Sequence, residues 1–205
     1  MKTIFIIPLL LMSLISPASW GADFEKGVAA YERKDYGTAL ILLEDFALMN
    51  NSQAQYLLGN MYGPRSWSGI NENRYGVASD DRKAIMWWRK AAEQGHAEAQ
   101  FQTGYWLYTG QMGLDANVVE GAAWYRKSAD QGNYWAQQEL GFAYRQGRGV
   151  PKDYVLAYMW LNLSASGNWE YANVAASARD SLGRQMAPKQ ITEAQRLARE
   201  WVAIQ

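Results

Sequence analysis

The feature that most constrains this chain of 205 residues is an internal repeat with a period of 36 to 37 residues. Tryptophan recurs at that spacing, at Trp87, Trp124 and Trp160. A glycine followed by an aliphatic residue recurs in step with it, as Gly76-Val77, Gly113-Leu114 and Gly149-Val150. Repeats of this length predict similar units stacked in a row, each contacting only its neighbours, rather than a single globule.

Each unit has the pattern of two helices joined by a turn. We expect the first helix to start near Ala54, Ala99 or Ala136 and to carry a glycine five residues later, where a neighbouring helix approaches closely. We expect the second helix to start after an N-cap residue, at Asp80, Asn117 and Asp153. A left-handed glycine should end each unit, at Gly95, Gly132 and Gly167. One such hairpin cannot bury its own apolar face, so the units should stack into an all-α solenoid.

Two segments resemble a known repeat. The run from Gly147 to Trp160, with Gly-Arg-Gly-Val-Pro-Lys-Asp-Tyr at its start, is similar to the Sel-one-like (SLR) repeat, and so is the run from Trp87 to Gln100. The SLR is a subclass of the tetratricopeptide-like repeat. The resemblance covers about residues 52–170 and divides them into 52–96, 97–133 and 134–169. Asn117 and Ser128 depart mildly from the pattern.

The resemblance implies a right-handed α-α superhelix. Members of the family usually act as adaptors in protein complexes, and bacterial members are often exported. Some cysteine-rich members are described as β-lactamases, but their disulfide-stapled hairpins have no counterpart in this cysteine-free chain.

The flanks of the repeats have the pattern of capping helices. Residues 22–51 resemble an ordinary tetratricopeptide helix pair. In residues 170–205 we expect a helix over Tyr171–Gln185 and a second helix started by Pro188. A solenoid needs such terminal units, with one polar face, to stay in solution.

The first 21 residues have the pattern of a secretory signal peptide. Lys2 precedes an apolar run from Ile4 to Ile15, and small residues follow that allow cleavage after Ala18 or Gly21. A retained membrane helix is the alternative, but it needs about 20 apolar residues, and this run is shorter and contains a proline. We therefore expect a periplasmic or secreted protein without a stable membrane span.

Composition limits the chemistry that the chain can perform. Lys plus Arg and Asp plus Glu both number 20, so the basic footprint of a nucleic-acid-binding protein is missing. The chain has no cysteine and a single histidine, His96, whose repeat counterparts are Asn133 and Asn168. A turn or cap role fits that column better than catalysis. We expect no enzyme, no catalytic residue, no metal site and no cofactor.

The expected function is binding, and six residues are candidates for it. The first unit is longer than the others by eight or nine residues within 63–75, and insertions in solenoids project from one face. Arginine, tryptophan and tyrosine are enriched in binding hot spots. The candidates are four residues of the insertion and two tryptophans near inter-helix turns: Arg65, Trp67, Arg74, Tyr75, Trp135 and Trp169. The expected partner is a protein or peptide of the cell envelope. The alternatives are a glycan stacked on exposed tryptophans and, less favoured, hydrolysis of the β-lactamase type.

Overall fold

The computed structural model describes residues 17–63, 77–111, 113 and 115–204, which form ten α-helices and no strand. The first four helices are α1 (Pro17–Glu32), α2 (Tyr36–Leu48), α3 (Ser52–Tyr62) and α4 (Asp81–Glu93). The next four are α5 (Ala97–Thr109), α6 (Val118–Asp130), α7 (Tyr134–Gln146) and α8 (Tyr154–Ala165). The last two are α9 (Ala172–Gly183) and α10 (Pro188–Ala203).

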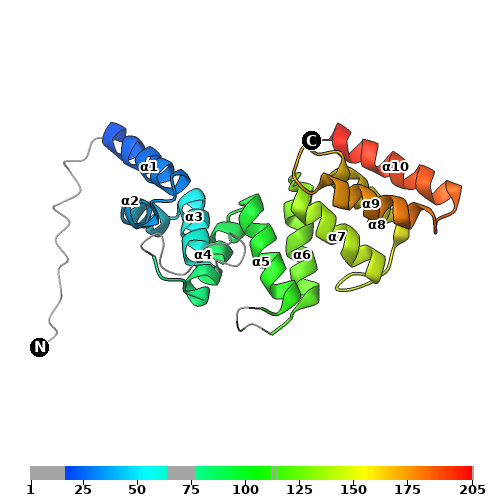
Figure 1. Cartoon of the computed structure of the whole chain (residues 1–205), viewed down its shortest axis with the longest axis horizontal. Coiled ribbons are helices and arrows are strands. Elements are labelled where there is room, and N and C mark those ends of the chain that lie inside the picture. The colour runs from blue at the N-terminus through cyan, green and yellow to red at the C-terminus, as the bar shows by residue number, and fades with distance from the viewer. Residues whose placement is uncertain (1–16, 64–76, 112, 114, 205) are drawn as a thin grey trace, which may run out of the picture.

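The helices form a curved row with α1 and α10 at its two ends (Figure 1). Each helix from α1 to α8 packs on the next one, and α10 packs back on α8. This nearest-neighbour pattern confirms the predicted all-α solenoid. In the described part of the chain, no helix is long and apolar enough to cross a bilayer.

The predicted N-caps are confirmed at the second helix of each unit. The side chains of Asp80, Asn117 and Asp153 each accept a hydrogen bond from the backbone N–H three residues later. The first helices start in the same way, with Asn51 before α3 and Asn133 before α7. Each cap satisfies a first-turn N–H that has no partner within its helix.

Glycine fulfils two different roles in the units, and one of our assignments was wrong. A β-carbon on Gly141 of α7 would lie 2.7 Å from Leu161 Cγ of α8, so only glycine lets these helices approach so closely. Gly95 and Gly132 have φ of +95° and +85°, as expected for residues that end a helix. Gly167 has no positive φ. Only glycine fits at this position because the Tyr134 ring lies against it: a β-carbon there would lie 2.5 Å from Tyr134 Cζ.

A ladder of glutamines fixes how successive units stack. Gln55 and Gln100 each donate through Nε2 to the carbonyl of an alanine at the end of the preceding helix, Ala47 and Ala92. Each also accepts from the glutamine that caps the C-terminus of its partner helix: Gln94 donates to Gln55 and Gln131 donates to Gln100, both at 2.7 Å. These buried bonds satisfy helix-end carbonyls that would otherwise have no partner.

The terminal helices cover the apolar ends of the row. Phe24 of α1 packs edge-on against Phe46 of α2, with ring centroids 5.2 Å apart. At the other end Pro188 is the first residue of α10, as predicted, and Trp201 of α10 covers the buried ring of Trp160 at 6.0 Å. These contacts explain how the repeat core is closed at both ends.

Candidate functional site

Four aromatic side chains meet where α7 begins and where the chain passes from α8 to α9. We call Tyr134, Trp135, Trp169 and Tyr171 the aromatic patch. Trp135 is the centre of the patch: its ring centroid lies 4.8 Å from that of Trp169 and 4.8 Å from that of Tyr171. Tyr134 stacks on the other side of Trp169 at 6.3 Å. The rings therefore form one contiguous group.

Local structure fixes each ring of the patch. Tyr134 and Trp135 are the first two residues of α7, directly after its cap Asn133. The indole N–H of Trp169 donates to the carbonyl of Ser164 in the last turn of α8, at 2.7 Å. The chain can place these rings together because Gly167 leaves room for the ring of Tyr134.

The patch remains open to solvent although its rings pack on each other. Tyr134, Trp135 and Tyr171 are 39%, 38% and 39% exposed, and Trp169 is partly buried. Ring pairs that keep this much accessible area offer a partner rigid apolar surface at a low entropy cost. The structure thus brings together the two predicted tryptophans. It adds Tyr134 and Tyr171, whose adjacency to Trp135 and Trp169 in the sequence was the signal that the sequence reasoning did not use.

The tryptophans that recur with the repeat have a different role. Trp87, Trp124 and Trp160 are all buried. Lys90 lies over the ring of Trp87 at 4.6 Å, and Lys127 lies over that of Trp124 at 4.0 Å. These rings form the packing between helices, as predicted, and are not available to a partner.

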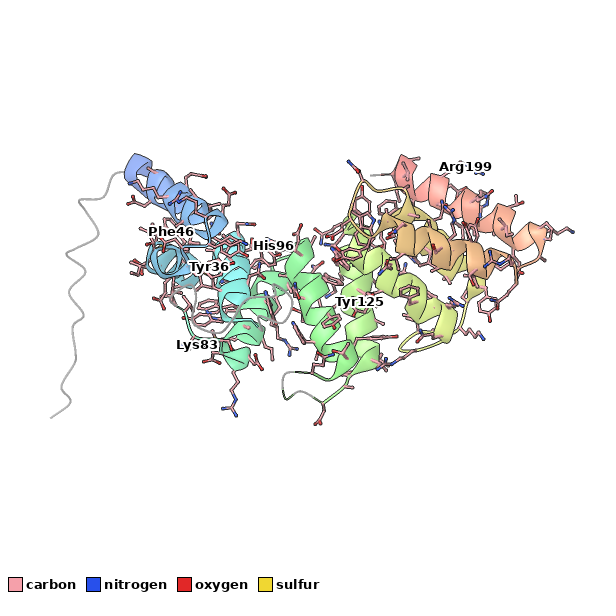
Figure 2. The ribbon with its side chains drawn as sticks, in the orientation of Figure 1. Tyr36, Phe46, Lys83, His96, Tyr125 and Arg199 are labelled. Atoms are coloured by element: carbon pink, nitrogen blue, oxygen red, sulfur yellow. The ribbon has the colours of Figure 1, made fainter. Side chains whose placement is uncertain are left out.

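Aromatic side chains continue from the patch onto α5 and α6. The ring of Phe101 lies 6.2 Å from that of Trp135 and 5.9 Å from that of Tyr125 on α6. Tyr108 lies 5.4 Å from Tyr125. Figure 2 shows Tyr125 in the middle part of the row of helices. Burial raises the pKa of the Tyr125 phenol far above its usual range, so this hydroxyl stays neutral.

One acidic side chain belongs to the same region. Glu139 of α7 follows Trp135 by four residues and so lies on the same face of the helix, one turn later. Burial raises the pKa of this carboxyl, against the opposing effect of a hydrogen bond from Gln138. Burial raises the pKa of Tyr108 as it does that of Tyr125, and the charge of Glu139 adds to both shifts.

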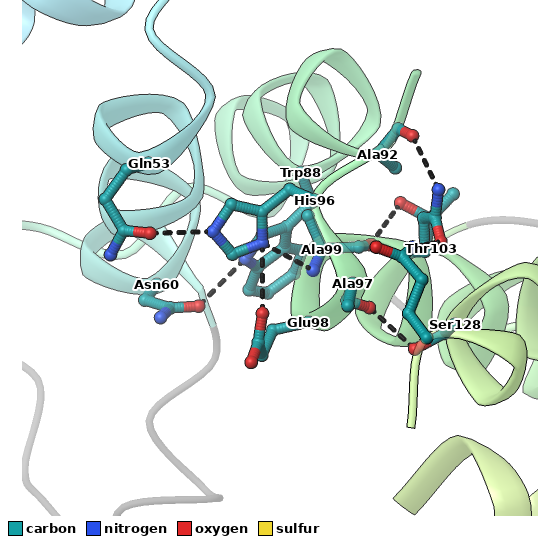
Figure 3. Close-up of polar contacts among 12 residues, drawn as sticks. Gln53, Asn60, Trp88, Ala92, His96, Ala97, Glu98, Ala99, Thr103 and Ser128 are labelled. Carbon is teal, nitrogen blue, oxygen red and sulfur yellow. Dashed lines mark hydrogen bonds and ion pairs between the residues drawn. The ribbon is translucent and has the colours of Figure 1, made fainter. Parts of the chain in front are cut away.

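The single histidine is part of the frame between two units. Its Nδ1 accepts from the backbone N–H of Ala99 at 3.4 Å, and its Nε2 lies 2.8 Å from Gln53 Oε1, so the neutral form with the proton on Nε2 satisfies both contacts (Figure 3). The imidazole stacks on Tyr56 at 4.5 Å. Burial lowers the pKa of His96, and the carboxylate of Glu98 opposes that shift.

His96 therefore caps a helix, as the sequence predicted, but one of its two counterparts was assigned wrongly. Asn133 caps α7 in the same way. Asn168 does not cap α9, because that helix begins at Ala172 after Tyr171, whose side chain forms no cap bond. Asn51, which caps α3, is the counterpart that the sequence reasoning missed.

Comparison with known proteins places this architecture in a family. The Sel1 repeat matches residues 52–96, 97–133 and 136–169. The chain belongs to the Sel1 repeat family. This repeat is typical of scaffolds for protein–protein interaction, and members of the family are generally non-enzymatic. The predicted resemblance is thereby confirmed.

Three relatives show the range of Sel1 repeat proteins that the chain is similar to. It is 32% identical over 150 residues to the ERAD-associated E3 ubiquitin-protein ligase component HRD3A of Arabidopsis thaliana, covering 71% of this chain and 22% of that protein. A Sel1 repeat protein from Oxalobacter formigenes superposes with a TM-score of 0.64 at 32% identity, covering 76% of this chain and 59% of the other.

The third is a protective antigen of uropathogenic Escherichia coli that displays an SLR fold. It superposes with a TM-score of 0.62 at 26% identity, covering 90% of this chain and 45% of the other. The chain thus spans about a fifth of the curated relative, and 59% and 45% of the two solved structures.

The other candidate residues of this Sel1 repeat protein lie outside the described residues. They are Arg65, Trp67, Arg74 and Tyr75. Within the described ranges, no group of three or more His, Cys, Asp or Glu side chains is arranged to hold a metal ion. The aromatic patch and Glu139 are therefore the described features on which a function can be built.

Proposed function

We propose that this protein is a binding scaffold of the cell envelope and that the aromatic patch is where it holds a segment of a partner protein. The observation that carries the proposal is the packing of Trp135 against Trp169 and Tyr171, with 38% of Trp135 still exposed. Tryptophan and tyrosine are the residue types enriched in hot spots. Their rigid frame, built on the N-terminus of α7, keeps the cost of ordering them low.

The relatives support the protein-binding part of this proposal. HRD3A is named as a component of a ubiquitin ligase, which is a multi-protein assembly. The charge balance of the chain, with 20 basic and 20 acidic residues, disfavours nucleic acid as the partner. We therefore propose a protein or peptide partner and a role without catalysis.

Site-directed crosslinking tests the binding surface. A photoreactive phenylalanine analogue is placed at Tyr134, inside the patch, and in a second variant at Val119 of α6, an exposed apolar residue outside the patch. We expect a specific adduct from Tyr134 alone, and we expect Trp135→Ala with Trp169→Ala to abolish it. Equal crosslinking from Val119 would contradict the proposal. Glycan-array binding that the same double variant removes would assign the patch to carbohydrate instead.

The envelope location has its own test. The leader predicts export, with a mature N-terminus between Ser19 and Asp23. Intact-mass measurement of protein recovered from the periplasm should give a chain that begins there. A mass that retains residues 1–16 would refute cleavage, and the location proposal with it, while leaving the binding surface untouched.

A further inference from the structure

The carboxyl group of Glu139 is not required by the repeat. Glu139 lies three residues after Ala136, and the same column is occupied by Leu57 in the first unit and by Gln102 in the second. Both of those residues are buried between helices. An acidic side chain at this position costs desolvation free energy that leucine avoids. Its presence therefore needs another explanation.

No cation of the described chain neutralises Glu139. Arg126, one of the arginines of this region, hydrogen-bonds the hydroxyl of Tyr144 and lies over the ring of Trp160 at 5.0 Å. Arg148 donates to the carbonyl of Tyr108 at 3.0 Å. The ion pairs found among the described residues do not include Glu139. A partly buried carboxylate without a counter-ion is a costly arrangement unless a ligand supplies the cation.

The carboxyl belongs to the face of α7 that carries Trp135. Trp135 lies one helical turn before it, and Phe101 of α5 contacts the ring of Trp135. The hydroxyl of Tyr125 on α6 is fully buried and has no hydrogen-bond partner among the described residues. Aromatic faces attract cations, and the attraction grows as water is excluded. A carboxylate together with several rings is complementary to an ammonium or guanidinium group and not to an anion.

We propose that Glu139, with Trp135 and the rings of α5 beside it, forms a subsite for a lysine or arginine side chain of the partner segment. The inference rests on the proposed function, because the segment is the one held by the aromatic patch. The patch contacts the apolar residues of the segment, and Glu139 pairs with the cation one turn further along α7.

Selection from a random heptapeptide library displayed on phage tests the inference. The library is selected in parallel on the wild-type protein, on Glu139→Gln, on Trp135→Ala with Trp169→Ala, and on Glu44→Gln. Glu44→Gln removes an exposed carboxylate of α2 and controls for the change in net charge. We expect wild type and Glu44→Gln to enrich peptides with a basic residue at one fixed distance from an aromatic or aliphatic residue, by about ten-fold or more. A hydrogen bond to a charged group is worth enough to give this factor.

The variants separate the inference from the function on which it rests. Glu139→Gln should still enrich the apolar residue and lose the basic one. Enrichment of apolar peptides by the wild type with no basic preference would overturn the cation subsite and leave the aromatic patch as a docking surface. If the wild type enriches no peptides beyond those enriched by Trp135→Ala with Trp169→Ala, both the cation subsite and the aromatic patch are overturned.

A stability measurement excludes a merely structural role for the carboxyl. Because burial raises the pKa of Glu139, its ionised form destabilises the fold, and stability is lost as pH rises through that pKa. Glu139→Gln should therefore melt at or above the wild-type temperature at pH 7 while losing the basic preference. A lower melting temperature for Glu139→Gln would show that the carboxylate holds the fold together, and would overturn the inference.

Discussion

His96 differs from the asparagines that cap the equivalent helices in that its acceptor can be protonated. Asn51 and Asn133 offer an amide oxygen whose charge does not change with pH. The Nδ1 of His96 accepts from Ala99 only while the imidazole is neutral, and protonation replaces that acceptor with a donor. Burial favours the same neutral form, since a charged imidazole is poorly solvated there. The hydrogen bond that caps the start of α5 therefore depends on pH.

We predict that His96 titrates below its ordinary pKa of 6.5. A histidine whose pKa is lowered in the folded state contributes stability above pH 6.5, and that stability is lost as pH falls through the folded-state value. As pH is lowered from 7.5 to 5, the melting temperature of the wild type should therefore fall relative to that of His96→Asn. The ring resonances of this single histidine give its midpoint directly by NMR. A midpoint above 6.5 would contradict the prediction.

The helices are held together through buried rings and a limited set of buried polar contacts within and between units. Ser128 and Ser164 each donate through Oγ to the carbonyl at the start of the paired helix, at 2.6 Å and 2.9 Å. The glutamine ladder connects the hairpins in the same way. It stops at Gln137, which donates to Ala129 but whose Oε1 is buried without a partner in the described chain. The position that would complete it is Ser166, the C-cap of α8.

We predict that Ser166→Gln stabilises the protein. Ser166 occupies the C-cap column of Gln94 and Gln131, both of which donate to the glutamine of their unit. A donor to the orphaned Oε1 of Gln137 should raise the free energy of unfolding by about 0.5–1.5 kcal/mol. Urea denaturation measures the change. The same substitution combined with Gln137→Leu is the control, and a gain that persists there would show that the ladder is not its source.

Trp124 tests the packing role of the recurring tryptophans. Its ring is buried in a cluster with Ala91 and Ala92 of α4 and Ala99 of α5, and Lys127 lies over it. We expect Trp124→Ala to lower the free energy of unfolding by about 3–5 kcal/mol, as for other large side chains removed from a core. Val119→Ala on the solvent face of α6 should change it by less than about 0.5 kcal/mol. A similar small loss for Trp124→Ala would place that ring on the surface.

At the scale of the whole molecule, stability depends on the two ends of the row. Each unit contacts only its neighbours, so the last unit depends on α9 and α10 for the burial of its outer face. The ring of Trp160 is almost fully buried, and Trp201 of α10 lies against it. Ala194 and Ala198 of the same helix are buried as well. The C-terminal helices are therefore part of the repeat core.

Removal of residues 187–205 should destabilise and aggregate the protein. The truncation exposes Trp160 and its apolar neighbours on α8. A loss of about 3 kcal/mol corresponds to a melting temperature lower by roughly 6–12 °C in a chain of this size. Calorimetry and light scattering measure the two effects. Ile204→Ala, at an exposed position of the same end, should leave both unchanged.

The repeat made the fold predictable from the sequence. The aromatic patch was harder to predict because it lies where the third unit departs from the repeat. Asp80, Asn117 and Asp153 reveal their helix starts because a cap depends on local sequence. The wrong assignment of Gly167 arose where the third unit leaves the common pattern. There, Tyr134 occupies the space that a side chain would need. The mutual contacts of Trp135, Trp169 and Tyr171 depend on how α7 packs against the segment that follows α8, which no single sequence column records.

The crossing of Trp135 and Trp169 has an optical consequence. Their ring centroids lie 4.8 Å apart and their planes are inclined at 62°, close enough for the electronic transitions of the two chromophores to mix. Such coupling produces paired bands of opposite sign in circular dichroism, whose size depends on the angle between the rings. Any molecule that settles on these rings alters that angle or the polarity around it. The protein therefore carries an intrinsic, label-free signal for occupancy at the place where we expect its partner to bind.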